Sequence, residues 1–177
     1  MIKFLFVGRL DTPKNPIMLL NVAHKVIQQY PDTVFTIVGD GEKYEECKQF
    51  IDKNNLSDNI RLEGWQNDVS PYYKDCDIFI MTSIYEAFGL IFLEAGYNKL
   101  PTIATNVEGI PEVVLHGKTG LLSDLNDVDA MTKNALFLIE HPDIRSVMGN
   151  NAYEYVTHNF SSEIMVGKYR DLYERSI

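Results

Sequence analysis

Segments of strand length, most of them apolar, alternate with helical segments through the first 125 residues of the chain. The strand-like segments are 2–7, 34–38, 60–64, 77–81 and 101–105, and a polar or glycine-containing loop follows each of them. A continuous apolar run is typical of a strand that is buried on both faces of a parallel sheet. Strands that alternate with helices along a chain need such a sheet. The sequence therefore predicts an α/β fold, a Rossmann-like parallel sheet with helices on both faces.

The chain has 177 residues, a length that fits a single domain over residues 1–177. From Asp127 the pattern is helical, with one helix to about residue 140 and another to about residue 158. Ser161 or Ser162 can cap a last helix, with Glu163 in its first turn. We therefore expect C-terminal helices over 127–177 to complete the domain.

The charge balance limits the possible ligands. The chain has 25 acidic and 16 basic residues, a net charge of −9, which argues against nucleic acid as a partner. An anionic ligand would have to be held by local positive groups. Cys47 and Cys76 form no metal or disulfide motif, so a reducing cytoplasm fits best. No segment reaches the roughly 18 apolar residues of a membrane span.

The stretch 82–97, TSIYEAFGLIFLEAGY, is a polar turn followed by an almost wholly apolar helix. It holds two acids, Glu86 and Glu94. If the helix starts near Ala87, the two carboxylates lie about 12 Å apart along its axis. The first amides of the helix would form an anion site between them. Such an arrangement suits a sugar, a diphosphate and a ribose, in that order.

A structural interpretation of the two acids is also open. Glu86 could simply cap the helix, since acids are favoured at a helix start, and Glu94 could reach solvent. The residues around Glu94 are apolar, which predicts that the helix is buried. A carboxylate in a buried helix is expensive unless something bonds to it, which favours a functional role for Glu94.

The two glutamates form an E-x7-E motif that resembles the signature of retaining glycosyltransferases of family 4, which have the GT-B fold. Further segments resemble the same family in the same order: VGRLDTPKNP, IVGDGEK, IRLEGW, YKDCDIFIMTS, PTIATNVEGIPEVV and HGKTGLL. The resemblance covers essentially the whole chain, but only one half of such an enzyme. It implies that the chain is the C-terminal, nucleotide-sugar-binding half of a GT-B fold.

The resemblance assigns the diphosphate of the donor to two basic residues and a helix start. Arg9 and Lys14 would contact the diphosphate, together with the amides near Phe88, Gly89 and Leu90, and would stabilise the departing charge. From charge alone, Arg9 and Lys14 could equally be a solvated basic pair.

The other candidate residues would hold the sugar and the nucleoside. By resemblance Glu86 orients the sugar, Glu94 binds the ribose and the loop of Trp65 lies against the base. Trp65 could instead be a partly buried aromatic anchor. Gly39 belongs to a loop that follows a strand, but its GDG sequence lacks the third glycine of a dinucleotide motif. We expect the loops 8–15, 39–42, 64–67, 82–89 and 105–112 to converge on one cleft.

Two positions depart from the family pattern. Asn15 stands where the family more often has glycine, and Glu108 replaces the first glycine of a pair whose backbone lies near the donor sugar. The change at Glu108 puts close backbone approach in doubt at that point and bears on the choice of sugar.

The implied function is transfer of a sugar, with retention, from a UDP- or GDP-sugar to an acceptor saccharide or lipid-linked saccharide in glycan or glycolipid synthesis. No DxD motif is visible, so we expect no metal and no other cofactor. The acceptor would bind an N-terminal domain, in cis or in trans, without which the chain would be inactive. We expect a cytoplasmic protein, peripheral at the membrane through that domain. A GT-B-like nucleotide-sugar epimerase and a non-catalytic nucleotide-binding subunit are the alternatives.

Overall fold

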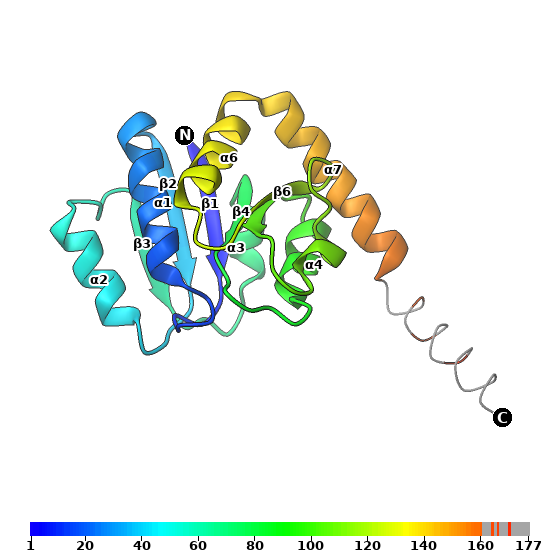
Figure 1. The fold of residues 1–177 in the computed structure, drawn as a ribbon, viewed down its shortest axis with the longest axis horizontal. Coiled ribbons are helices and arrows are strands. Elements are labelled where there is room, and N and C mark those ends of the chain that lie inside the picture. The colour runs from blue at the N-terminus through cyan, green and yellow to red at the C-terminus, as the bar shows by residue number, and fades with distance from the viewer. Residues whose placement is uncertain (161–163, 165, 167–169, 171–177) are drawn as a thin grey trace.

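The computed structural model describes residues 1–160 together with residues 164, 166 and 170. Its centre is a six-stranded parallel sheet in the order β3-β2-β1-β4-β5-β6, flanked by helices (Figure 1). The strands are β1 (Ile2–Val7), β2 (Thr33–Val38), β3 (Ile60–Gly64), β4 (Ile78–Met81), β5 (Thr102–Thr105) and β6 (Gly120–Ser123). The helices are α1 (Pro16–Gln29), α2 (Tyr44–Lys53), α3 (Ser70–Lys74), α4 (Leu90–Tyr97), α5 (Ile110–Val113), α6 (Val128–Glu140) and α7 (Pro142–Asn159). The predicted α/β fold is confirmed.

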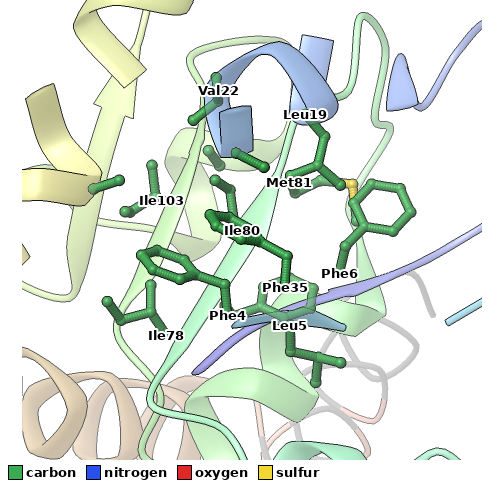
Figure 2. Close-up of a cluster of buried hydrophobic side chains, with 14 of the residues drawn as sticks. Phe4, Leu5, Phe6, Leu19, Val22, Phe35, Ile78, Ile80, Met81 and Ile103 are labelled. Atoms are coloured by element: carbon green, nitrogen blue, oxygen red, sulfur yellow. The ribbon is translucent and has the colours of Figure 1, made fainter. Parts of the chain in front are cut away.

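Strand β1 is the centre of the core. It pairs in parallel with β2 on one side and with β4 on the other, and its residues from Phe4 onward are buried. Phe4 stacks on Phe35 of β2 with the ring centroids 4.5 Å apart (Figure 2). Ile78 and Ile80 of β4 add to the same cluster of buried side chains. The apolar segments that predicted strands are therefore the segments that form the core.

The helices form two groups, which meet where α6 contacts α7. Helix α1 packs against α2 and α6, whereas α4 packs against α7. On the α4 side, the ring of Phe79 in β4 contacts Tyr73 of α3 and Phe92 of α4, at 5.8 and 5.9 Å between centroids. The sheet is thus covered on both faces, as predicted for strands that are apolar on both sides.

Two elements were not predicted. Helix α5 lies within the segment that was expected to be a loop, and β6 follows the turn at 116–120. Strand β6 is an edge strand, and the imidazole of His116 accepts a hydrogen bond from the backbone N–H of Leu122, 3.0 Å between Nδ1 and N. Gly117 N–H donates to the carbonyl of Gly120 in the same turn. The turn before β6 therefore folds back and covers part of its edge.

The C-terminal helices α6 and α7 agree with the sequence as far as the structure describes them. Asp127 caps α6, since its carboxylate accepts the backbone N–H of Ala130 at 2.8 Å. The break between the two helices falls at His141, as predicted. The cap predicted at Ser161 or Ser162 and the first turn at Glu163 lie outside the described residues.

Among the described residues, no helix is both long and apolar enough to cross a membrane. Both cysteines are free thiols. Burial raises the pKa of Cys47 to about 11 and that of Cys76 to about 12. Since the thiolate is the reactive form, both side chains are unreactive packing residues at neutral pH.

The contact between α7 and the turn that joins α4 to β5 leaves no room for a side chain at Gly149. A Cβ atom there would lie 2.1 Å from the carbonyl oxygen of Lys99. We expect Gly149→Ala to lower the free energy of unfolding by about 1–3 kcal/mol, because the backbone must move to accept the methyl group. Asn150→Ala is the matched control in the same helix, and it should leave stability unchanged or slightly raised because Asn150 is exposed. Urea unfolding of both variants measures the difference, and equal stability would contradict the tight contact.

Candidate functional site

The order of the strands reverses between β1 and β4, which pair directly although two strands separate them in the sequence. Open α/β sheets bind ligands at such a point, outside the carboxyl ends of the strands. The loop 8–15 follows β1 and the loop 82–89 follows β4. Two of the loops that were predicted to converge therefore flank this crevice.

Backbone and hydroxyl hydrogen bonds join the two loops. The buried hydroxyl of Thr82 lies 3.0 Å from the carbonyl oxygen of Lys14 and 2.9 Å from that of Asn15. The N–H of Ile84 donates to the carbonyl of Pro13 at 2.8 Å. These bonds fix the position of the Lys14 backbone relative to the end of β4.

The side chains of Lys14 and Glu86 meet across the crevice. Lys14 Nζ forms an ion pair with Glu86 Oε2, and the two side chains are only 17% and 13% exposed. The capping role considered for Glu86 is wrong, because the N-cap of α4 is Gly89. Lys14 is not a solvated base either, since most of its side chain is covered. The pair is a charged contact largely withdrawn from water, which salt screens less than a surface pair.

Arg9 is placed differently from Lys14. Its side chain is 78% exposed, and its Nη2 lies 3.0 Å from Oδ2 of Asp11. The other oxygen of Asp11 accepts the backbone N–H of Lys14 at 3.1 Å, and the Asp11 side chain is 13% exposed. One carboxylate therefore holds the guanidinium of Arg9 and the backbone of Lys14 together.

The loop after β5 packs against the loop after β4. Gly109 N–H donates to the carbonyl of Glu86 at 3.1 Å, and a Cβ atom on Gly109 would lie 2.1 Å from the carbonyl oxygen of Ala87. The hydroxyl of Thr105 donates to the carbonyl of Ser83 at 2.5 Å. The contacts of Gly109 require a residue without a side chain at this position.

Both positions that depart from the family's glycines have a left-handed backbone. Asn15 has φ 50° and Glu108 has φ 43°. Asparagine tolerates this region, but glutamate adopts it at a cost of about 1–2 kcal/mol. The backbone at these positions is therefore of the kind that glycine adopts freely, and the doubt raised by Glu108 concerns its side chain rather than the path of the chain.

Helix α4 starts later than predicted. It begins at Leu90, after Gly89 in a left-handed conformation (φ 76°), and not near Ala87. Glu86 therefore lies in the loop, and the axial separation of the two carboxylates that assumed one helix does not apply. The N–H of Phe92 donates to the carbonyl of Gly89 at 3.0 Å, and the first two amides of the helix are left for an outside acceptor. Phe88, just before the helix, packs on Phe160 with the ring centroids 5.6 Å apart.

The prediction that α4 is buried holds for one face of the helix, that of Phe92 and Ala95, and is wrong for the other. Glu94 is exposed, as are Leu90 (65%) and Tyr97 (63%) on the same helix. Glu94 lines a hollow of about 610 Å³ between α3, α4 and α7, together with Ser70 and Tyr73. Burial, reinforced by the adjacent Glu94 carboxylate, raises the pKa of the Tyr73 hydroxyl, which stays a proton donor at neutral pH.

Arg9, Gly39 and Trp65 line a second hollow of about 220 Å³. Val69 lines both hollows, which are therefore adjacent. Trp65 is 68% exposed, so the alternative of a partly buried anchor is wrong. Gly39 has a structural reason for being glycine, because a Cβ atom there would lie 1.9 Å from the carbonyl oxygen of Gly8.

Sequence reasoning missed Asp11 and Ser83. Asp11 lies between Arg9 and Lys14, and this spacing was the available signal. Ser83 gives no signal in the sequence. Its Oγ is the one buried side-chain polar atom without a hydrogen-bond partner in the part of the chain that the structure describes. Such an atom normally has water or a ligand as its partner, and it lies at the end of β4 beside the crevice.

Comparison with known proteins agrees with this arrangement. The model of the family described as "Glycosyl transferases group 1" matches residues 2–155. The chain is 35% identical over 173 residues to the Escherichia coli UDP-Gal:alpha-D-GlcNAc-diphosphoundecaprenol alpha-1,3-galactosyltransferase, an alignment that covers 96% of this chain and 44% of that protein. It is 33% identical over 142 residues to N-acetyl-alpha-D-glucosaminyl L-malate synthase of Bacillus anthracis, with 80% and 37% covered. The chain spans less than half the length of these relatives.

Among solved structures, a mutant of S. aureus TarM in complex with Fondaparinux, alpha-GlcNAc-glycerol and UDP is similar in fold. The TM-score is 0.91 at 24% sequence identity, and the match covers 96% of this chain and 35% of that one. The likeness concerns the arrangement of the sheet and its helices.

The strained backbone of Glu108 gives a test of the site's geometry. We expect Glu108→Gly to raise the free energy of unfolding by about 1 kcal/mol relative to Glu108→Ala, because only glycine adopts the left-handed conformation without a Cβ penalty. Both variants lose the same carboxylate, so their difference isolates the backbone term. Thermal and urea unfolding measure it, and two equally stable variants would mean that the loop does not hold this conformation in solution.

Proposed function

The chain belongs to the group 1 glycosyl transferases, and we propose from this premise that it is the donor-binding half of a retaining glycosyltransferase. It would take a sugar from a uridine diphosphate sugar and pass it to an acceptor saccharide or lipid-linked saccharide in glycan or glycolipid synthesis. The observation that carries the proposal is the pairing of Lys14 with Glu86 across the crevice between β1 and β4. It joins a candidate phosphate ligand to a candidate sugar ligand at the point where such sheets bind nucleotides.

The nucleoside would lie along the two adjacent hollows. The exposed ring of Trp65 can stack on a base, and Glu94 in the neighbouring hollow can accept hydrogen bonds from ribose hydroxyls. Uridine is the proposed base because the name of the E. coli relative specifies UDP-Gal and the TarM structure contains UDP.

The diphosphate would lie between Arg9, Lys14 and the first turn of α4. A helix start offers amides to an anion, and the two cations supply the local positive charge that a chain of net charge −9 needs. Candidate amides are those near Phe88, Gly89 and Leu90. In the reaction the bond between the sugar carbon and the diphosphate oxygen breaks, and the same groups stabilise the negative charge that develops there.

We propose that neither a metal nor another cofactor takes part. Among the described residues, no group of three or more His, Cys, Asp or Glu side chains is placed to hold a metal ion. The cations Arg9 and Lys14 would neutralise the diphosphate instead. No observation favours the epimerase or the non-catalytic subunit over the transferase.

The acceptor would bind a second domain, in cis or in trans. The relatives are more than twice as long as their match to this chain. Two large apolar side chains near the crevice are exposed, namely Tyr85 and Leu90 at 59% and 65%. A partner surface across the crevice would cover them. Any association with the inner face of a membrane would come through that second domain.

Calorimetry tests the proposed ligand and its independence of metal. We expect UDP to bind at least about tenfold more tightly than GDP, and to bind equally in magnesium and in chelator. A loss of about tenfold in chelator, or ~1.4 kcal/mol, would mean that a metal-bridged diphosphate is involved. Absence of UDP binding under both conditions would contradict the proposed function.

A transfer assay with radiolabelled UDP-sugar tests the division of labour. We expect no glycosylated acceptor from this chain alone, and product when the N-terminal half of a relative is supplied in trans. Robust transfer by the chain alone would contradict the need for a second domain. Conversion of the donor sugar without any acceptor would instead identify an epimerase.

A further inference from the structure

The ammonium of Lys14 already has an anion bound to it. In the described part of the chain, the Glu86 carboxylate has no other hydrogen-bond or ion-pair partner than Lys14. Its oxygen occupies one of the donor positions of the Lys14 ammonium. A diphosphate that binds Lys14 must therefore either displace Glu86 or share the ammonium with it.

The pair formed by Arg9 does not raise the same conflict. Arg9 is 78% exposed and its guanidinium carries five N–H donors, so it can bind phosphate while it keeps Asp11. Asp11 is also held from the other side by the backbone N–H of Lys14. The Glu86 carboxylate has no such second contact among the described residues, so it is the carboxylate that can leave its cation. The N–H of Gly109 binds the backbone carbonyl of Glu86 and does not hold the side chain.

From this asymmetry we propose that Glu86 is a specificity-determining competitor: it makes the site select a sugar-bearing donor over the bare nucleoside diphosphate. The inference rests on the proposed function. When a bare diphosphate binds Lys14, the displaced carboxylate remains beside a second anion with no compensating partner. When the diphosphate carries a sugar, the sugar hydroxyls donate hydrogen bonds to the displaced carboxylate.

Lys14 could hold both anions, because an ammonium has three donors. Sharing it would place a carboxylate and a phosphate side by side, and like charges at this distance repel in a site with little water. The penalty falls on the bare diphosphate, which is also the leaving group of the transfer reaction. Return of Glu86 to Lys14 would then weaken the hold on the nucleoside diphosphate once the sugar has gone.

The test compares UDP with a UDP-sugar by calorimetry on the wild-type chain and on Glu86→Gln. The probe sugar is the tightest binder among UDP-glucose, UDP-galactose and UDP-N-acetylglucosamine. Glutamine keeps the shape of the side chain and removes its charge. We expect UDP to bind about tenfold more tightly to the variant. We also expect the preference for UDP-sugar over UDP to fall at least about tenfold. UDP affinity that is unchanged or weaker in Glu86→Gln would overturn the inference.

Two further variants separate the possible causes. Glu42→Gln removes a different carboxylate near the crevice. Glu42 accepts a hydrogen bond from Thr12, which lies in the same loop as Lys14, with 3.1 Å between Oε1 and the hydroxyl oxygen. This variant should change UDP affinity less than about twofold. A gain in affinity as large as that of Glu86→Gln would mean that removal of any nearby negative charge has the same effect.

Glu94→Gln should weaken UDP binding. If it does and Glu86→Gln fails to tighten UDP, the competition is wrong but the proposed function stands. If the wild-type chain does not bind UDP, both fail.

The fold of each variant is checked by thermal unfolding, and a crystal structure with UDP provides a measurement that does not depend on a variant. In the complex we expect Lys14 Nζ within hydrogen-bond distance of a phosphate oxygen and more than about 4 Å from the Glu86 carboxylate. An intact Lys14–Glu86 pair with UDP bound would overturn the inference.

Discussion

The parallel pairing of β1 with both β2 and β4 is the constraint on which the rest of the structure depends. All the other neighbouring strands also pair in parallel, so every loop that follows a strand emerges at the same edge of the sheet. The chain continues from β1 to β2 on one side of it, and β4 lies on the other side. The loops that follow β1 and β4 therefore run in opposite directions and leave a crevice between them. The positions of Lys14 and Glu86, 72 residues apart in sequence, follow from this topology.

The charges around the crevice show how an acidic chain can hold an anion. Arg9 and Lys14 each have a carboxylate partner, so the group of four side chains is formally neutral before any ligand arrives. The carboxylate partner offsets the free-energy cost of a partly buried ammonium without a counter-ion. It also means that affinity for an anion depends on which carboxylate can move, and not on the number of cations. Net charge alone could not have predicted this.

The sequence predicted those features that depend on neighbouring residues in the chain, such as the bounds of strands. The bounds of β1 agree with its apolar segment, because a strand buried on both faces leaves a continuous signal. The bounds of β3, an edge strand that is only partly buried, also agree, and there the glycine at its end was the signal. The start of α4 was missed because the loop before it is held by distant partners, Pro13 and Gly109, which compete with the helix. The exposure of Glu94 was missed for another reason: apolar residues on a helix predict burial, but they do not say which face of the helix the rest of the chain covers. The Lys14–Glu86 pair is tertiary and left no local trace.

The hydrogen bond from Leu122 to His116 has a consequence for how this chain behaves among its own copies. A parallel sheet that ends in a bare strand offers a row of unpaired amides, and another strand can add to it. At β6 a side chain accepts one of these amides, so the sheet is closed there by its own preceding turn. A lone domain with exposed apolar residues at its crevice is already prone to associate. The covered edge does not prevent such association through apolar side chains, but it opposes growth of one sheet into the next copy at β6.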